Sequence, residues 1–88
     1  MSEEETLLKF PCQFPIKAMG KNTADFDAIV IEIVRQHVGD IKEGAVQSRL
    51  SKGDKYLSVT VTIEATSRKQ LDAIYQGLTD CTEVLMAL

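Results

Sequence analysis

The stretch YLSVTVTIEA, residues 56–65, alternates apolar and polar side chains over its whole length. Its apolar positions are Leu57, Val59, Val61, Ile63 and Ala65. Successive side chains of a strand point to opposite faces, and β-branched residues favour strands. The stretch therefore predicts a strand with one buried face and one polar face.

A helix with one buried side is predicted before this strand. Apolar residues recur there every third or fourth position, as on the buried stripe of a helix. They are Phe26, Ile29, Val30, Ile33, Val34 and Val38. Thr23 or Asn22 is predicted to cap the helix, and Gly39 to end it.

A second helix is predicted after the strand, beginning with a capping box from Ser67 to Gln70. Its apolar stripe consists of Leu71, Ile74, Tyr75 and Leu78. Gly77 falls inside this stripe, where glycine costs about 1 kcal/mol relative to alanine. We therefore expect the helix to end near Gly77.

Three further segments predict the remaining strands. The last is Val84–Ala87, and a weaker one covers residues 43–51. The first segment, residues 10–20, contains Pro15. Proline lacks a backbone N–H and avoids central strands. We expect the regular strand to start near Ile16 and to end at Gly20. Phe10–Pro15 is then an extended approach, or Pro15 forms a bulge.

The predicted order is strand, helix, strand, strand, helix, strand, with one apolar side on each element. This pattern predicts an α+β, ferredoxin-like βαββαβ two-layer sandwich: a four-stranded antiparallel sheet with both helices on one face. The first and third strands are expected at the centre. Residues 10–88 would form this single domain, and residues 1–9 a flexible acidic leader.

Composition limits the classes of function. The chain has 88 residues, 10 basic and 13 acidic, with a net charge of −3. Glu3, Glu4 and Glu5 account for the excess, so the rest of the chain is balanced. A balanced body argues against nucleic-acid binding driven by counterion release. We also expect no membrane span and no export signal, and therefore a cytoplasmic protein.

Catalytic and metal-binding patterns are not legible in the sequence. Cys12 and Cys81 are the two cysteines, and the predicted sheet places them too far apart for a disulfide. His37 falls at a helix C-terminus, where positive charge is favoured without catalysis. We predict a non-enzymatic protein with no metal and no cofactor.

Two surface regions are candidates for binding. Gly20, Lys21 and Asn22 precede a helix, whose free amides could hold an anion, although a tight turn explains them as well. The polar faces of the strands carry Lys17, Arg49, Tyr56 and Ser58, and our register adds Met19 and Leu85. The second group is either a partner-binding surface or a solvated sheet face.

The sequence also resembles the YbeD family of small bacterial proteins. The likeness rests on Phe10-Pro11, Phe14, Lys17, Met19-Gly20 and His37, on Ser51-Lys52-Gly53 followed by Tyr56 and Ser58-Val59, and on Ile63 with Ala65-Thr66. The resemblance implies the same fold, similar to ACT-type regulatory domains, and no established activity. It carries a lipoate-regulatory label but no catalytic residues.

ACT-type domains often bind amino acids at the loop after the first strand. That analogy implies a ligand site at Met19, Gly20, Lys21 and Asn22. Lys17 and Met19 stand where many such domains have an acidic residue. We therefore predict a regulatory module that binds a small metabolite, a partner protein or both. The alternative is a protein–protein adaptor that uses the open sheet face or an edge strand and has no small ligand; the oligomeric state stays open.

Overall fold

The computed structural model describes residues 9–88. The strands are β1 (Cys12–Lys21), β2 (Val46–Leu50), β3 (Tyr56–Ala65) and β4 (Val84–Ala87), and the helices are α2 (Phe26–Val38) and α3 (Arg68–Asp80). A short 3-10 helix, Glu43–Ala45, precedes β2. The predicted leader lies outside the described residues, apart from Lys9.

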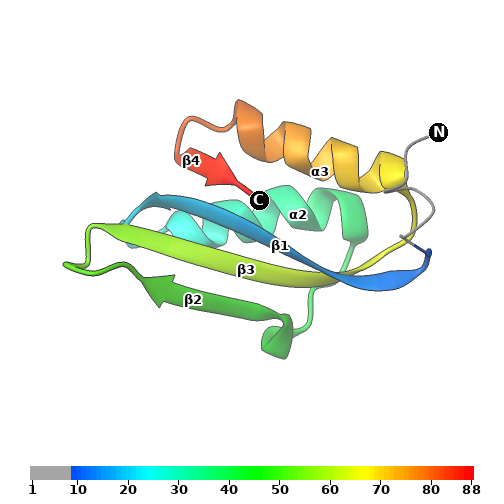
Figure 1. Ribbon diagram of the computed structural model, residues 1–88, viewed down its shortest axis with the longest axis horizontal. Helices are drawn as coiled ribbons and strands as arrows, with labels where there is room; N and C mark the ends of the chain where they lie inside the picture. The colour runs from blue at the N-terminus through cyan, green and yellow to red at the C-terminus, as the bar shows by residue number, and fades with distance from the viewer. Residues whose placement is uncertain (1–8) are drawn as a thin grey trace.

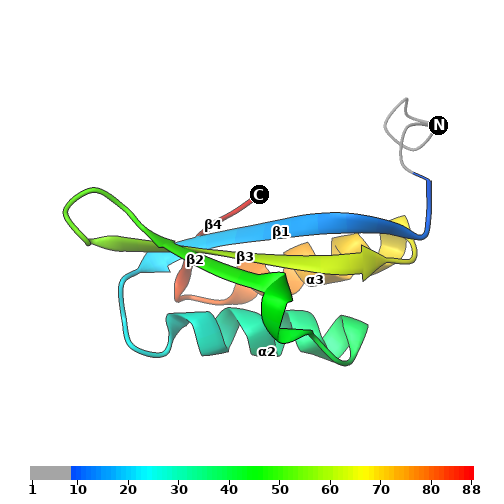
Figure 2. The ribbon, with the colours of Figure 1, turned by 90° about the horizontal axis from the view of Figure 1, so that it is seen from below.

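The four strands form one sheet in the order β2-β3-β1-β4, and all neighbouring pairs are antiparallel. β1 and β3 are therefore central, as predicted. Both helices lie on one face of the sheet, and Figure 1 looks onto the face that residues 9–88 leave uncovered. Figure 2 shows the two layers from the side. The predicted ferredoxin-like α+β sandwich is confirmed.

Strand β1 is longer than predicted, because it runs through Pro15 without a bulge. Its ladder to β3 is continuous and pairs Pro15 with Thr62. Lys17 N–H donates to Leu88 O at 3.1 Å, so the backbone groups of odd-numbered β1 residues point toward β4. The ladder between β1 and β4 does not reach Pro15. The missing N–H therefore removes no sheet hydrogen bond.

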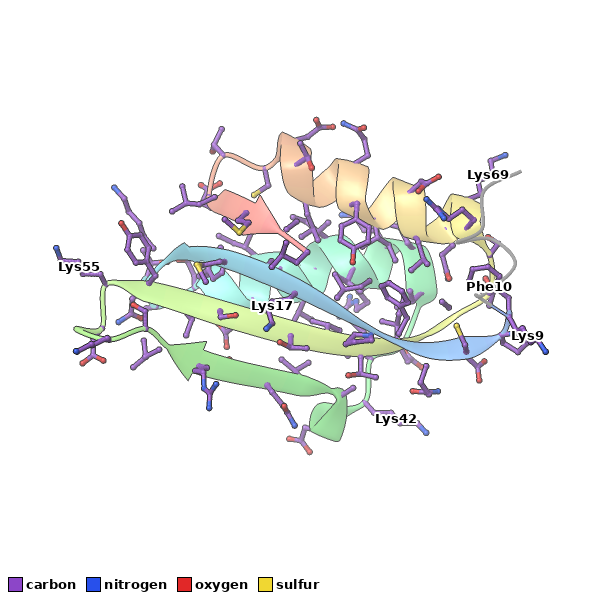
Figure 3. The ribbon with its side chains drawn as sticks, in the orientation of Figure 1. Lys9, Phe10, Lys17, Lys42, Lys55 and Lys69 are labelled. Carbon is purple, nitrogen blue, oxygen red and sulfur yellow. The ribbon has the colours of Figure 1, made fainter. Side chains whose placement is uncertain are left out.

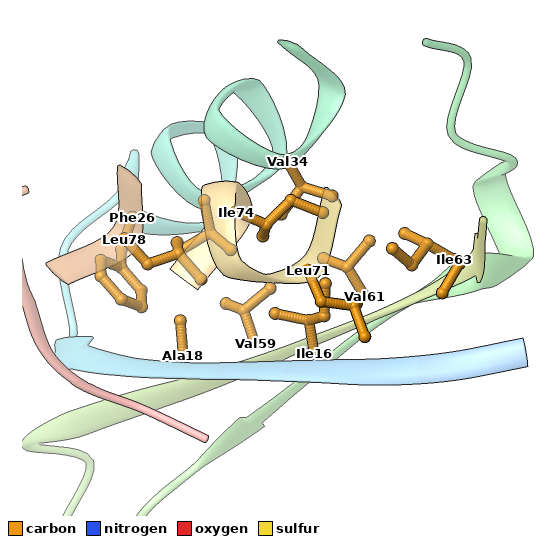
Figure 4. Close-up of a cluster of buried hydrophobic side chains, with 12 residues drawn as sticks. Ile16, Ala18, Phe26, Val34, Val59, Val61, Ile63, Leu71, Ile74 and Leu78 are labelled. Atoms are coloured by element: carbon orange, nitrogen blue, oxygen red, sulfur yellow. The ribbon is translucent and has the colours of Figure 1, made fainter. Parts of the chain in front are cut away.

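The core lies between the sheet and the helices (Figure 4) and is entirely apolar: no polar or charged side chain of residues 9–88 is buried. Its members are Ile16, Ala18, Phe26, Val30, Val34, Val59, Val61, Ile63, Ala65, Leu71, Ile74 and Leu78. Each fully buried side chain of the Val, Leu, Ile or Phe type contributes roughly 1.5–3 kcal/mol. The alternation of β3 and the two helical stripes thus supply the core, as predicted.

Helix α2 begins later than predicted, because Asn22 has other partners. Its N-cap is Asp25, which makes no side-chain capping bond. Asn22 instead ties the end of β1 to the turn between β2 and β3. Its backbone N–H donates to Lys55 O, and its side-chain amide donates to Asp54 O, both at 3.0 Å. The predicted cap at Thr23 or Asn22 is therefore wrong.

Helix α3 has the predicted cap but does not end at Gly77. Ser67 Oγ accepts the Gln70 N–H at 3.0 Å, and Gln70 Oε1 accepts the Thr66 N–H at 2.8 Å. The helix continues to Asp80. A Cβ at Gly77 would lie 3.0 Å from the Ile33 Cγ2, so the glycine lets α3 approach α2 closely. Its position reflects helix packing, not a helix end.

Candidate functional site

The side of the sheet that residues 9–88 leave uncovered, here called the open face, is the first candidate surface. Strand alternation and register place on it the side chains opposite to the core. They are Gln13, Pro15, Lys17, Met19 and Lys21 of β1, Gln47 and Arg49 of β2, Tyr56, Ser58, Thr60, Thr62 and Glu64 of β3, and Met86 of β4. Four of the five residues predicted as a partner surface lie here: Lys17, Arg49, Tyr56 and Ser58.

An apolar row crosses this face near the turn between β2 and β3. Met19 is opposite Ser58 on one side and Met86 on the other. Tyr56 is a diagonal neighbour of Met19, within reach of a long side chain. Tyr56 is 41% exposed and Met86 52% exposed. This row is unusually apolar for a solvent-facing strand surface.

Strand pairing places Met86, and not Leu85, beside Met19 on the open face. The β1–β4 ladder shifts between Met19 and Gly20, which pairs Met86 with Met19 and leaves Leu85 without a partner on β1. Such a bulge changes the direction of the residues that follow it. Met86 therefore occupies the place predicted for Leu85. A four-residue strand gives too little alternation to reveal a bulge from sequence.

Three exposed cations surround the apolar row. Lys17 and Lys21 flank Met19 along β1, and Arg49 is next to Ser58 on β2. Among residues 9–88 the ion pairs are Arg35 with Glu32 and Arg68 with Asp72, both on helices. The three open-face cations thus have no carboxylate within ion-pair distance in that part of the chain.

The segment predicted to bind a ligand, residues 19–22, is not a single exposed loop. Gly20 is buried inside β1. A Cβ at Gly20 would collide with the Phe26 ring and the Glu83 carbonyl oxygen. The Asn22 N–H, one of the amides expected to meet an anion, already donates to Lys55 O. Met19, Gly20, Lys21 and Asn22 are therefore split between the open face, the strand interior and the turn contact.

A small hollow lies beside this strand end. Its volume is about 300 Å³. It is lined by Lys21, Thr23, Phe26, Thr82, Glu83 and Leu85. The Glu83 carboxylate accepts the Thr82 hydroxyl at 3.0 Å and the Cys81 thiol at 3.4 Å. These hydrogen bonds, the one from Thr82 first, lower the pKa of Glu83. Lys21 and Glu83, which carry opposite charges, thus both line the hollow.

A wider cleft of about 800 Å³ lies at the opposite end of the sheet, and the sequence analysis did not find it. It lies where β2 pairs with β3 only up to Val61, so the end of β3 has a strand on its β1 side but none on its β2 side. His37 and Gln70 line it. The Gln70 side-chain N–H donates to His37 O at 3.1 Å, which joins the end of α2 to the start of α3.

Metal-binding clusters and membrane-spanning helices are absent from residues 9–88. No group of three or more His, Cys, Asp or Glu side chains in that range could hold a metal ion. Cys12 and Cys81 are free thiols, as predicted. No helix in the same range is long and apolar enough to cross a membrane.

Comparison with known families agrees with this description. A family described as "Protein of unknown function (DUF493)" matches residues 5–88. The chain belongs to this family. A UPF0250 protein of Nitrosomonas europaea is 46% identical over 97% of this chain and 98% of its own length. Another, from Chromobacterium violaceum, is 44% identical over 98% and 97%. The predicted likeness to small bacterial YbeD-type proteins is confirmed, and the names carry no activity.

A solved structure supports the fold independently. The solution structure of protein HP0495 from H. pylori matches with a TM-score of 0.74, covering 92% of this chain and 85% of that one. The two sequences are 20% identical. At that identity the likeness speaks for the fold alone. The ligand site and partner surface predicted from sequence stay predictions.

Proposed function

We propose that this DUF493 protein is a non-enzymatic binding module that docks a partner protein on its open face. The observation that carries the proposal is the apolar row of Met19, Met86 and Tyr56 on the open face, bordered by three cations that have no ion-pair partner among residues 9–88. Aromatic, methionine and arginine side chains are enriched in protein interfaces relative to the rest of a protein surface, whereas lysine is depleted there. The helix face is instead covered by polar residues and local ion pairs.

Site-specific photo-crosslinking tests this proposal. A photoreactive amino acid would replace Thr60 at the centre of the open face, and in a matched variant Ala28 on the exposed side of α2. Both variants would be expressed in the protein's native cells and irradiated. We expect one discrete adduct from position 60 only, lost when Tyr56 is also changed to alanine. Equal adducts from both positions, or none from position 60, would contradict the proposal.

A second candidate function is the binding of a small metabolite in the hollow near Gly20. Lys21 and Glu83 line the same hollow, and their opposite charges would suit the two charges of an amino acid. Its volume of about 300 Å³ equals the lower limit of typical ligand pockets. This candidate agrees with the regulatory function predicted from the ACT-type resemblance. The link to lipoate metabolism that the family label suggests also stays a prediction.

An NMR titration separates the two candidates. Amino acids, lipoate, octanoate and nucleotides would be added to the ¹⁵N-labelled protein. Saturable shifts at the amides of residues 17–24 and of Glu83 would establish the metabolite site. A spectrum that no compound changes would leave partner binding as the function, and the variant Glu83→Gln serves as the control for any charged ligand.

A further inference from the structure

Charge is segregated between the two layers, although the described chain is close to neutral. The helix layer and its turns, residues 25–38 and 68–83, carry six acidic and three basic side chains. The open face and the turn at residues 51–55 carry the reverse excess. Their basic residues are Lys17, Lys21, Arg49, Lys52 and Lys55, and their acidic residues are Asp54 and Glu64. The open face is thus a cationic surface that the net charge of the sequence conceals.

The cations have a defined spacing on the pleated surface. Lys17 and Lys21 are four residues apart on β1, or about 13 Å along the strand. Arg49 is two strands from Met19, so its Cα lies roughly 12 Å from those of both lysines. Met19 lies midway between the lysines. We call Lys17, Lys21 and Arg49 the cationic triangle; Figure 3 shows Lys17 at the middle of this face.

From this geometry we propose that the cationic triangle docks an extended acidic segment of the partner protein, with the pattern acidic-x-apolar-x-acidic. The inference rests on the proposed function and names the partner's chemistry. In an extended chain, side chains at i, i+2 and i+4 share one face and span about 13 Å. The two carboxylates then meet Lys17 and Lys21, while the central apolar side chain meets Met19.

Two other occupants fit the surface less well. A second copy of this chain, related by a two-fold axis, would bring two cationic triangles together, and like charges across an interface cost several kcal/mol. Single-stranded nucleic acid needs aromatic side chains for base stacking. The centre of the open face has Ser58, Thr60 and Thr62, with Tyr56 at one end as its aromatic residue. An acidic protein segment satisfies both the charges and the apolar row.

The test uses a synthetic peptide containing two copies of Glu-Ser-Leu-Ser-Glu, titrated into the ¹⁵N-labelled full chain. We expect saturable shifts at the amides of β1 and of residues 47–60. The same peptide with Gln in place of Glu should bind about tenfold more weakly or not at all. Raising the salt from about 50 to about 200 mM should weaken the Glu peptide severalfold, since exposed charge pairs are screened.

Charge-matched variants locate the site. The double substitution Lys17→Glu and Arg49→Glu should weaken the Glu peptide by about tenfold or more. Lys42→Glu and Lys69→Glu make the same change of charge away from Lys17, as Figure 3 shows, and should alter the affinity less than about twofold. Both double variants must keep the dispersed spectrum of the folded protein.

Each outcome decides one of the claims. Equal binding of the Gln peptide, equal loss in both double variants, or tighter binding of a ten-residue uridine oligonucleotide on the same amides would overturn the inference. The crosslinking experiment reports separately on the proposed function. A position-60 adduct with a partner that lacks the acidic pattern would leave that function standing and remove this inference. Peptide binding without any adduct would contradict the proposed function, and with it this inference, which rests on that function.

Discussion

The packing of β1 against Phe26 and Glu83 requires glycine at position 20. Any Cβ there would enter space held by the Phe26 ring and the Glu83 carbonyl oxygen. The ring could shift, but the backbone carbonyl belongs to the turn that starts β4. We expect Gly20→Ala to lower the free energy of unfolding by about 1–3 kcal/mol, the usual cost of overpacking. Urea denaturation followed by circular dichroism measures it.

A matched substitution shows that the effect comes from packing. Nothing lies within 4 Å of a Cβ built at Gly44, and its φ is not positive. Gly44→Ala should therefore leave stability within about 0.5 kcal/mol or raise it slightly, because alanine restricts the unfolded chain. If Gly20→Ala proved as harmless as Gly44→Ala, the close contact of β1 with Phe26 would be wrong.

Tyr75 gives the fold a pH dependence at its alkaline limit. Its hydroxyl donates to Leu88 O at 2.7 Å, and burial raises the pKa of Tyr75 above its ordinary value near 10. A group whose folded pKa is raised stabilises the fold fully below its unfolded pKa. That contribution is lost as the pH rises through the folded pKa. We therefore expect stability to fall above about pH 10, and less so in Tyr75→Phe.

The titration of Tyr75 can be observed directly. The chain has two tyrosines, so Tyr56→Phe leaves Tyr75 as the single phenol. Phenolate absorbance of this variant should have a higher midpoint in the folded protein than in urea. Equal midpoints in the two states would show that Tyr75 is not buried as the structure places it.

The start of α3 is held by one side-chain bond that can be removed alone. Ser67 Oγ accepts the Gln70 N–H, one of the amides that the helix itself cannot satisfy. Ser67→Ala should cost about 1 kcal/mol of unfolding free energy. Thr79→Ala, on the exposed side of the same helix, should be neutral or stabilising because alanine is the better helix former. A loss equal in both variants, measured by urea denaturation, would argue against the cap.

The elements with long apolar periodicity were predictable. β3 alternates over ten residues and the two helices have complete stripes, so pattern alone identifies their buried sides. The misjudged residues are those whose neighbours come from elsewhere in the chain. Pro15 is tolerated because β4 stops short of it, Gly77 is explained by Ile33, and Asn22 is bound to the turn near Asp54. No local pattern contains these contacts.

The candidate surface was predictable only in part, for a related reason. Lys17, Arg49, Tyr56 and Ser58 follow from strand alternation, because each belongs to a segment whose register is clear. The position of Met86 on this face does not follow from alternation, because a bulge in a short edge strand decides which residue pairs with Met19. The excess of positive charge on the open face was also not predicted, because a balanced net charge does not show how the charged residues are distributed between the two layers.

The division of charge predicts that the open-face cations contribute little to the stability of the fold. Its cations have no ion-pair partner among residues 9–88, and neighbouring like charges repel. We expect the triple variant Lys17→Gln, Lys21→Gln and Arg49→Gln to unfold within about 0.5 kcal/mol of the parent, or to be slightly more stable. Urea denaturation at about 0.15 M salt makes the comparison.

The control removes three cations from elsewhere in the protein: Arg35→Gln, Lys42→Gln and Lys69→Gln. Arg35 pairs with Glu32 at 3.9 Å, with both side chains exposed, and exposed pairs contribute about 0–1 kcal/mol. The control should therefore be no more stable than the open-face variant, although both lose three positive charges. A marked destabilisation of the open-face variant alone would mean that Lys17, Lys21 and Arg49 hold the sheet together. The cationic triangle would then be a structural feature, and its use as a docking site would lose its physical basis.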